Sequence, residues 1–404
     1  MINIYLKILF IGISLQSFYF YELGLPLVSV LSLVLMFITF LLKGKAFRGD
    51  YGANALALCY IITVIWSFIG LFFHETNPDL KRLLSFLLMI IATYTASQLF
   101  HRINNESLLR AYLLAHSFFF FLQFIIYYTT GYLIDYVEPI TGEQSRAIGG
   151  SFELSSGLFA RTCGLFTEPG TYVNAIAPFV AIFLRFYKNS LSNKIIFWIS
   201  MATLPLSFST FGIVFFIIII ISAEFINSFY RLSALFVSIS IAIDYFYNRF
   251  VILTDLGQES GLEFRYSFIA QSINIDSVIT FFFGRNVLIT NVMDRAGIYG
   301  AVNDTGLFFF ILYFLGPVLT FAIIIVIFYA FLKSDRYSRM ALFFIFISKN
   351  SIFAPFFPFF VIAAMSGYAK RRTHTPYSHL SEKTSNLKSN FSLLTGNNVK
   401  NSLK

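Results

Sequence analysis

Charged residues are scarce in this chain of 404 residues. Asp, Glu, Lys and Arg make up 12% of it, about half of the roughly 25% that soluble domains carry, whereas apolar residues make up 57%. So few charges cannot cover a water-facing surface, which excludes a soluble enzyme, a protein with a single membrane anchor and a disordered chain. Because the apolar runs are continuous rather than alternating, a β-barrel is disfavoured. The composition predicts an all-α integral membrane protein.

Cysteine and the common catalytic signatures are also scarce. The two cysteines, Cys59 in an apolar run and Cys163 in a polar segment, lack metal-type spacing, and we expect no disulfide between them. The chain contains no Gly-rich nucleotide loop, no His/Cys metal cluster, no Ser-His-Asp pattern and no Asp-x-Asp pair. We therefore expect no cofactor and no metal. The formal charge of +9 is explained by membrane topology and not by nucleic-acid binding.

Apolar runs long enough to cross a membrane, or nearly so, follow one another from Ile4 to residue 369. They predict about 12 transmembrane helices, with 10–12 as the range, in one polytopic domain of residues 1–369. Two pairs of runs are joined so tightly that each also fits a re-entrant hairpin, which sets the lower bound. The predicted helices are 4–21, 24–42, 54–73, 83–100, 111–133, 169–187, 194–209, 211–229, 232–247, 305–332, 338–349 and 351–369.

Basic residues are distributed unevenly between the two sides of this topology. With the N-terminus in the cytoplasm, about 20 of the 29 Lys and Arg and about 5 of the 20 acids fall inside, as expected from the excess of Lys and Arg in cytoplasmic loops. Both termini are therefore predicted to be cytoplasmic. Residues 370–404 are rich in Ser, Asn, Lys and Thr, and we expect a disordered cytoplasmic tail there.

Two predicted outer segments are long, 134–168 and 248–304, and they hold most of the outer arginines. Topology requires positive charge but not arginine, whose planar guanidinium grips phosphate oxygens two at a time. We therefore expect the outer arginines to bind a lipid-linked pyrophosphate at the outer surface. The alternative is that they pair with the outer acids in solvated loops. The outer arginines are Arg82, Arg146, Arg161, Arg249, Arg265, Arg285 and Arg295.

The string Arg161-Thr-Cys-Gly-Leu-Phe-Thr-Glu-Pro-Gly170 leads directly into a predicted membrane helix. Pro169 suits the first turn of a helix, and Glu168 stands where a carboxylate interacts favourably with the helix dipole. Glu168 is thus a candidate N-terminal cap and a candidate general base at the membrane surface, and the two interpretations are compatible. Aromatic residues in and near the loops are candidates for sugar stacking or for packing: Tyr132, Phe152, Phe159, Phe166, Tyr172 and Tyr299.

This string resembles the signature region of the O-antigen polymerase and O-antigen ligase superfamily, whose members are multispanning glycosyltransferases that use undecaprenyl-pyrophosphate-linked sugars outside the bacterial inner membrane. The two long outer loops are similar to those of the polymerases. So is the spacing of an arginine, ten residues and a glycine, which fits Arg146 to Gly157 and Arg295 to Gly306. The segment 303–316 resembles the motif that ends the second loop. The resemblance covers roughly residues 135–320 and implies a GT-C-like bundle.

Within the superfamily, the chain is more similar to the polymerases than to the ligases. Ligases carry a histidine at the end of the second loop, where this chain has Asn303-Asp304. The resemblance implies that the protein polymerises lipid-linked oligosaccharide repeat units into O-antigen or capsular polysaccharide, with a chain-length regulator and a flippase as partners. Alternatives are an O-antigen ligase, or a flippase or exporter of the lipid-linked oligosaccharide.

The predicted site residues follow from the loops and from the resemblance. Glu168 or Asp304 would take the proton of the acceptor hydroxyl, and Glu168 is favoured because Pro169 begins a rigid helix. The arginines would hold the pyrophosphate and stabilise its charge as it leaves. The substrate-binding set is Arg146, Gly157, Arg161, Gly164, Arg249, Arg265, Arg285, Arg295 and Gly306.

Overall fold

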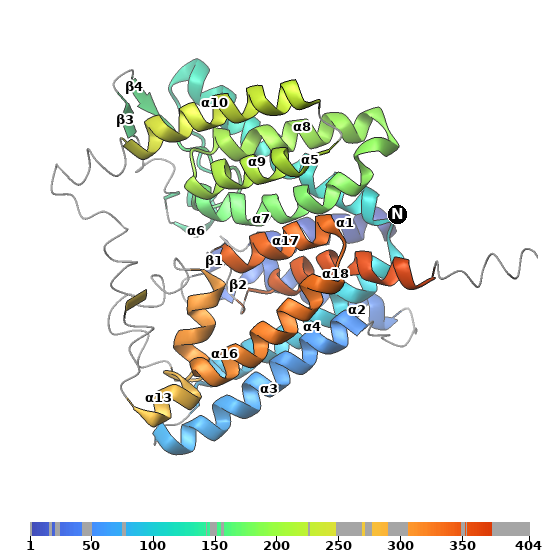
Figure 1. Ribbon diagram of the computed structural model, residues 1–404, viewed down its shortest axis with the longest axis vertical. Helices are drawn as coiled ribbons and strands as arrows, with labels where there is room; N and C mark the ends of the chain where they lie inside the picture. The colour runs from blue at the N-terminus through green and yellow to red at the C-terminus, as the bar shows by residue number, and fades with distance from the viewer. Residues whose placement is uncertain are drawn as a thin grey trace, which may run out of the picture.

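Figure 1 shows the computed structural model of the protein, a bundle of α-helices with two short β-hairpins. The helical class predicted from the composition is therefore confirmed for the part of the chain that the structure describes. The described residues are 2–15, 18–20, 25–42, 51–74, 78–142, 144–145, 152–154, 157–224, 227–247, 269–270, 277–289, 306–348, 352 and 354–373.

Each of the twelve predicted apolar segments overlaps a helix. These are α1 (Ile2–Ser14), α2 (Leu27–Leu42), α3 (Tyr51–His74), α4 (Leu80–Arg102), α5 (Asn105–Thr130), α7 (Pro169–Phe183), α8 (Leu191–Leu206), α9 (Thr210–Ser222), α10 (Ser228–Tyr247), α16 (Leu307–Lys333), α17 (Arg336–Ile347) and α18 (Phe357–Thr373). The shorter elements are α6 (Glu138–Thr141), α13 (Val278–Phe283), the 3-10 helix η1 (Leu184–Asn189), and the antiparallel pairs β1 (Tyr19–Phe20) with β2 (Leu25–Pro26) and β3 (Phe152–Leu154) with β4 (Gly157–Phe159).

Several helix boundaries differ from the predicted ones, because polar caps and local pairing decide where a helix ends. The side chain of Asp79 accepts the N–H of Lys81 and starts α4 three residues before the predicted 83–100. Asn104 caps α5 in the same way. The first helix ends at Ser14 and not at residue 21, since Tyr19 and Phe20 pair with β2 instead.

Five helices are long and apolar enough to cross a membrane, judged by length and composition within the described residues. They are Tyr51–Phe73, Leu80–Arg102, Asn105–Thr130, Pro169–Asn189 and Leu307–Lys333. Shorter apolar helices are α1, α2, α8, α9 and the stretch Phe357–Ser366 of α18. The membrane class is supported by these helices, whereas the count of about twelve crossings stays a prediction.

The helices lie side by side with their axes running roughly across the view of Figure 1. At one end lie α6, α13 and both hairpins, and we call this the loop end. At the opposite end lie the N-terminus and the last turns of α18, and we call this the terminal end. Both ends of the described chain thus lie on the same side of the bundle.

Helix α7 lies in the middle of the bundle, and nearly all of its side chains are buried. The ring of Phe179 lies 4.8 Å from Tyr112 of α5, 5.6 Å from Phe10 of α1 and 5.0 Å from Phe360 of α18, between ring centroids. A helix that is apolar on all faces is stable only when neighbours surround it. The start of α7, where the predicted site residues lie, is therefore anchored to the core.

Ion pairs and amide contacts join the helices at the terminal end. Glu106 at the start of α5 pairs with Arg110 at 2.8 Å and accepts the amide of Asn193 of α8 at 2.9 Å. Arg185, just after α7, pairs with Asp335 before α17 at 2.7 Å. The bundle is thus closed by polar contacts at this end, whereas irregular segments and hairpins occupy the loop end.

Candidate active site

The segment from Arg161 to Glu168 is an irregular stretch at the loop end that leads into α7. It brings together three of the predicted site residues. Arg161 and Glu168 are half-buried, and Gly164 between them is buried. This part of the predicted set is therefore local in space as well as in sequence.

The side-chain amide of Gln123 on α5 holds this segment in place. Its Oε1 accepts the N–H groups of Cys163 and Gly164, both at 2.8 Å, and its Nε2 donates to the carbonyl of Ile134 at 2.7 Å. Gln123 is fully buried, and it satisfies three backbone groups that need partners in the interior. One side chain thereby ties the beginning of the 134–168 segment to its end.

The turn after Cys163 depends on Gly164 and Phe166. Gly164 has φ +57°, in the left-handed region where glycine is favoured. The Phe166 N–H donates to the Cys163 carbonyl at 3.2 Å, and the buried ring of Phe166 lies 5.3 Å from that of His116 and 5.8 Å from that of Tyr172. Phe166 and Tyr172 therefore serve packing and not sugar stacking.

Glu168 occupies the N-cap position of α7, and its carbonyl accepts the N–H of Tyr172 at 3.1 Å. Its carboxylate makes no capping hydrogen bond and instead folds back over the next turn. A Cβ placed on Gly170 would lie 3.2 Å from Glu168 Oε1 and 4.0 Å from Oγ of Ser209, the N-cap of α9. The carboxylate thus lies close to the first turns of two helices, whose dipoles favour its negative charge.

Asp135 is a site residue that the sequence pattern did not single out. Its carboxylate accepts the N–H groups of Val137 at 2.8 Å, Glu138 at 3.1 Å and Ser145 at 2.6 Å. Partial burial acts to raise the pKa of Asp135, but these hydrogen bonds outweigh it and lower the pKa below its usual value. A signal existed in the sequence, since an Asp shortly before Glu138-Pro139 is typical of a turn closed by its own side chain.

Three charged groups act on the buried thiol of Cys163. Burial raises the pKa of this thiol to about 12, the carboxylates of Asp135 and Glu168 add to the rise, and the guanidinium of Arg161 opposes it. Because such charge effects fall off with distance, all three groups lie in the neighbourhood of Cys163. One cation and two carboxylates are thus among the charged residues of this region.

Arg285 lies at a second place on the loop end, directly after α13. Helix α16 is interrupted at Gly316, which has φ +75° and ψ +164°, followed by Pro317. The Arg285 N–H donates to the carbonyl of Tyr313, one turn before this interruption, at 2.9 Å. Arg285 is thus held against α16 by its backbone.

The neighbouring α3 and α4 also hold this segment. Trp66 of α3 donates to the carbonyl of Phe282 at 3.0 Å, and the side chain of Asn286 donates to the carbonyl of Ser67 at 2.8 Å. The N–H of Asp79, the cap of α4, donates to the carbonyl of Leu288 at 2.9 Å. The position of Arg285 is therefore determined by three different helices.

The remaining predicted site residues are placed separately. Gly157 begins β4, and Gly306 precedes α16, where a Cβ would lie 3.1 Å from the carbonyl oxygen of Ile347. The others lie outside the described residues: Arg146, Arg249, Arg265, Arg295 and Asp304. Of the two candidate bases, Glu168 is thus the one whose surroundings the structure describes.

A buried polar layer lies beneath the segment, between helices. Nε2 of His116 on α5 lies 2.9 Å from Oγ of Ser14 on α1, whose hydroxyl donates to the carbonyl of Ile11 at 2.6 Å. His116 and Ser14 thus share a hydrogen bond that joins α5 to α1. Ser117 and Ser200 of α8 share a further hydrogen bond of 3.1 Å. Such bonds link membrane helices through polar side chains, and here they fix the helices that surround the start of α7.

Comparisons of this chain with models of protein families, with curated proteins and with solved structures find no match. The chemistry of the site is accordingly given by its own groups: one guanidinium, one hydrogen-bonded carboxylate in Asp135, and one carboxylate in Glu168 that makes no capping bond. Such a set can bind an oxyanion and accept a proton within one small region.

Proposed function

We propose that this chain is a membrane glycosyltransferase that polymerises undecaprenyl-pyrophosphate-linked oligosaccharide repeat units into O-antigen or capsular polysaccharide. The observation that carries the proposal is that Arg161 and Glu168 lie in one segment, which Gln123 holds in place at the start of the buried α7 and which resembles the superfamily signature. In this proposal the bundle crosses a bacterial inner membrane about 10–12 times in a GT-C-like arrangement. The loop end faces outward and both termini are cytoplasmic.

The proposed reaction transfers the growing glycan from its lipid carrier to the next lipid-linked repeat unit. A hydroxyl oxygen of the acceptor sugar attacks the anomeric carbon of the donor, and the bond from that carbon to the pyrophosphate oxygen breaks with its electron pair staying on the pyrophosphate. The acceptor proton goes to Glu168, whose half-buried carboxylate lies over the first turn of α7 beside Gly170. The guanidinium of Arg161 stabilises the charge that develops on the pyrophosphate.

Asp135 supports this arrangement without a direct part in the transfer. Its carboxylate is taken up by three backbone N–H groups, so it orders the turn at Val137 and Glu138 and fixes the position of Ser145. Arg285 is held at a different position on the loop end, where a second lipid-linked phosphate would bind. Two arginine positions suit a reaction in which donor and acceptor both carry a lipid pyrophosphate.

The ladder of surface glycan lengths tests the proposal. A strain that lacks the gene is complemented with the wild type, with Arg161→Ala, with Arg161→Lys or with Glu168→Gln, and the amount of each protein in the membrane is measured. We expect Arg161→Ala and Glu168→Gln to abolish long chains while one repeat unit remains attached to its acceptor. Arg161→Lys keeps the charge but not the planar fork and is expected to give short chains.

Arg336→Ala is the matched control, because Arg336 lies at the terminal end and is exposed, paired with Glu224. We expect a wild-type ladder from it. Loss of all glycan on deletion, including the single unit, would instead indicate a ligase or a flippase. A full ladder from Arg161→Ala at normal protein levels would overturn the roles assigned to this site.

A further inference from the structure

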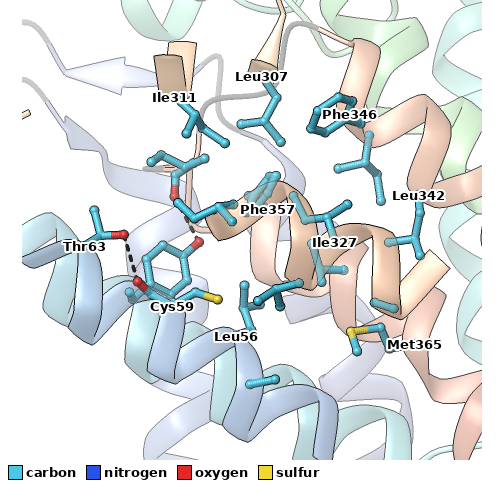
Figure 2. Close-up of a pocket in the computed structure, with 18 of the residues that line it drawn as sticks. Leu56, Cys59, Thr63, Leu307, Ile311, Ile327, Leu342, Phe346, Phe357 and Met365 are labelled. Atoms are coloured by element: carbon cyan, nitrogen blue, oxygen red, sulfur yellow. Dashed lines mark hydrogen bonds between the residues drawn. The ribbon is translucent and has the colours of Figure 1, made fainter. Parts of the chain in front are cut away.

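An apolar cavity lies between α3, α16, α17 and α18, away from the start of α7. Its volume is about 120 Å³, similar to the roughly 150 Å³ of an engineered apolar cavity that stays dry and binds benzene. Leu307 and Ile311 line it from the part of α16 before the interruption, and Ile327 from the part after it. Leu56 of α3 and Phe357 of α18 line the other sides (Figure 2).

The polar groups in the cavity wall are already satisfied by the protein. The hydroxyl of Thr63 donates to the carbonyl of Cys59 at 2.8 Å, and the hydroxyl of Tyr60 donates to the carbonyl of Ile352 at 3.1 Å (Figure 2). These are the two hydroxyl side chains in the wall. A sugar or a phosphate would find no hydrogen-bond partner here and would lose its hydration. The chemistry of the wall therefore fits a hydrocarbon chain.

The cavity is connected to the surface that would face lipid. Val326 of α16 lines it and is 43% exposed, and Ile62 on the neighbouring face of α3 is an exposed apolar residue. Both α3 and α16 are long and apolar enough to cross a membrane. The side of the cavity that Val326 lines would therefore face the lipid.

The cavity also lies next to a phosphate-binding candidate. Leu315 lines the cavity and is two residues after Tyr313, whose carbonyl accepts the N–H of Arg285 at 2.9 Å. The backbone of Arg285 and a hydrocarbon cavity thus meet at the interruption of α16. This juxtaposition matches an amphiphile that has a phosphate head and a long tail.

We propose that this cavity binds a segment of the polyprenyl tail of a lipid-linked substrate, with its phosphate at Arg285. The inference rests on the proposed function for the choice of a polyprenyl chain over a phospholipid acyl chain. Because lipid tails are as apolar as the wall, the preference comes from close packing and not from the hydrophobic effect. A cavity of this size encloses about one isoprene unit, and the rest of the tail stays in the bilayer.

Binding of undecaprenyl phosphate, which carries no glycan, tests the proposal. The purified full-length protein in detergent is titrated with undecaprenyl phosphate or with phosphatidylglycerol, and bound lipid is counted by native mass spectrometry. Cys59→Phe places a ring inside the cavity, whereas Leu58→Phe places the same ring on the adjacent position, which is 55% exposed. Ala55→Leu is a smaller change in the same cavity wall. It replaces Cys59→Phe in the binding measurement if Cys59→Phe fails to reach the membrane.

We expect Cys59→Phe and Ala55→Leu to weaken binding of undecaprenyl phosphate about tenfold. This is the loss expected when roughly two methylene groups of the tail no longer fit in the cavity. Leu58→Phe should bind like the wild type. Arg285→Ala should weaken binding of undecaprenyl phosphate but not of undecaprenol, which has no phosphate. Wild-type binding by both cavity variants overturns the proposal, and so does equal binding of phosphatidylglycerol.

The outcome is separate from the outcome of the glycan ladder. If the cavity variants bind normally while Arg161→Ala still abolishes long chains, the polymerase proposal stands and the tail site does not. If the cavity variants lose the lipid while Arg161→Ala gives a full ladder, the tail site stands and the transfer chemistry must be reassigned.

Discussion

Gly284 and Gly316 touch through their backbones. A Cβ on Gly284 would lie 2.4 Å from the nitrogen of Gly316, and a Cβ on Gly316 would lie 2.7 Å from the nitrogen of Gly284. Both have positive φ, +65° and +75°. The contact lets α13 dock at the interruption of α16, and it brings Arg285 and the apolar cavity to the same point. No other residue type offers both the backbone conformation and the space.

Replacing Gly316 by Ala is expected to destabilise the protein strongly. The new Cβ meets backbone atoms, which cannot move aside as a flexible side chain can, and the expected loss is about 3 kcal/mol or more. Gly131→Ala is the matched control, since Gly131 also has positive φ, +73°, but has nothing within 4 Å of the added Cβ. It should cost only about 1 kcal/mol. Thermal unfolding in detergent measures both, and equal losses would contradict the close contact.

Gln123→Leu is expected to release the segment that carries Arg161. The variant leaves the N–H groups of Cys163 and Gly164 buried without an acceptor, at a cost of about 2–3 kcal/mol. Gln123→Glu keeps an acceptor for both N–H groups, and at this fully buried position we expect the acid to stay protonated and to donate its O–H to the Ile134 carbonyl, so it should be milder. The unfolding midpoint and the glycan ladder report the two effects. Leu122→Ala, at a partly exposed neighbour on α5 (36% exposed), controls for a general weakening of the helix.

Asp135 makes the 134–145 stretch sensitive to acid. Because its pKa is lowered in the folded protein, the stabilisation is fully present above the unfolded value of about 3.9 and is lost as the pH falls through the lower folded value. In Asp135→Asn only one of the two carboxylate oxygens remains as an acceptor, and the N–H₂ group that replaces the other cannot accept a backbone N–H. The variant should lower the free energy of unfolding by about 1 kcal/mol at neutral pH. The difference between wild type and variant, followed by limited proteolysis of this stretch, should shrink as the pH falls below about 4. A difference that stays constant from pH 7 to pH 3 would contradict the role of the ionised carboxylate.

The ion pair between Arg185 and Asp335 should contribute measurable coupling energy. Both side chains are 16% exposed and 2.7 Å apart, and we expect a double-mutant cycle with alanine to give about 1–2 kcal/mol. The pair of Arg336 and Glu224 at the same end is the control, with exposures of 46% and 80%. It should give less than about 0.5 kcal/mol. Equal coupling in the two pairs would show that burial does not distinguish them.

The helices were largely predictable because they depend on neighbours along the chain. Scarce charge and continuous apolar runs place a helix on each predicted segment, and Pro169 after Glu168 marks the start of α7. The same local reasoning placed Arg161, Gly164 and Glu168 in one segment. It failed at the end of α1, where the pairing of Tyr19 and Phe20 with β2 competes with the helix.

Only the tertiary structure decided which residues far apart in the sequence come into contact. Gln123 reaches Cys163 across forty positions. Asp135, which carries a turn signal but no catalytic one, lies near the same buried thiol. Arg285 was predicted as one of several similar arginines, but its place beside the interruption of α16 depends on the contact of Gly284 with Gly316. Composition and periodicity determine which segments form helices, since these signals lie within one segment. Which helices meet, and which polar groups they bring together, is decided only when the packed side chains and buried backbone groups find their partners.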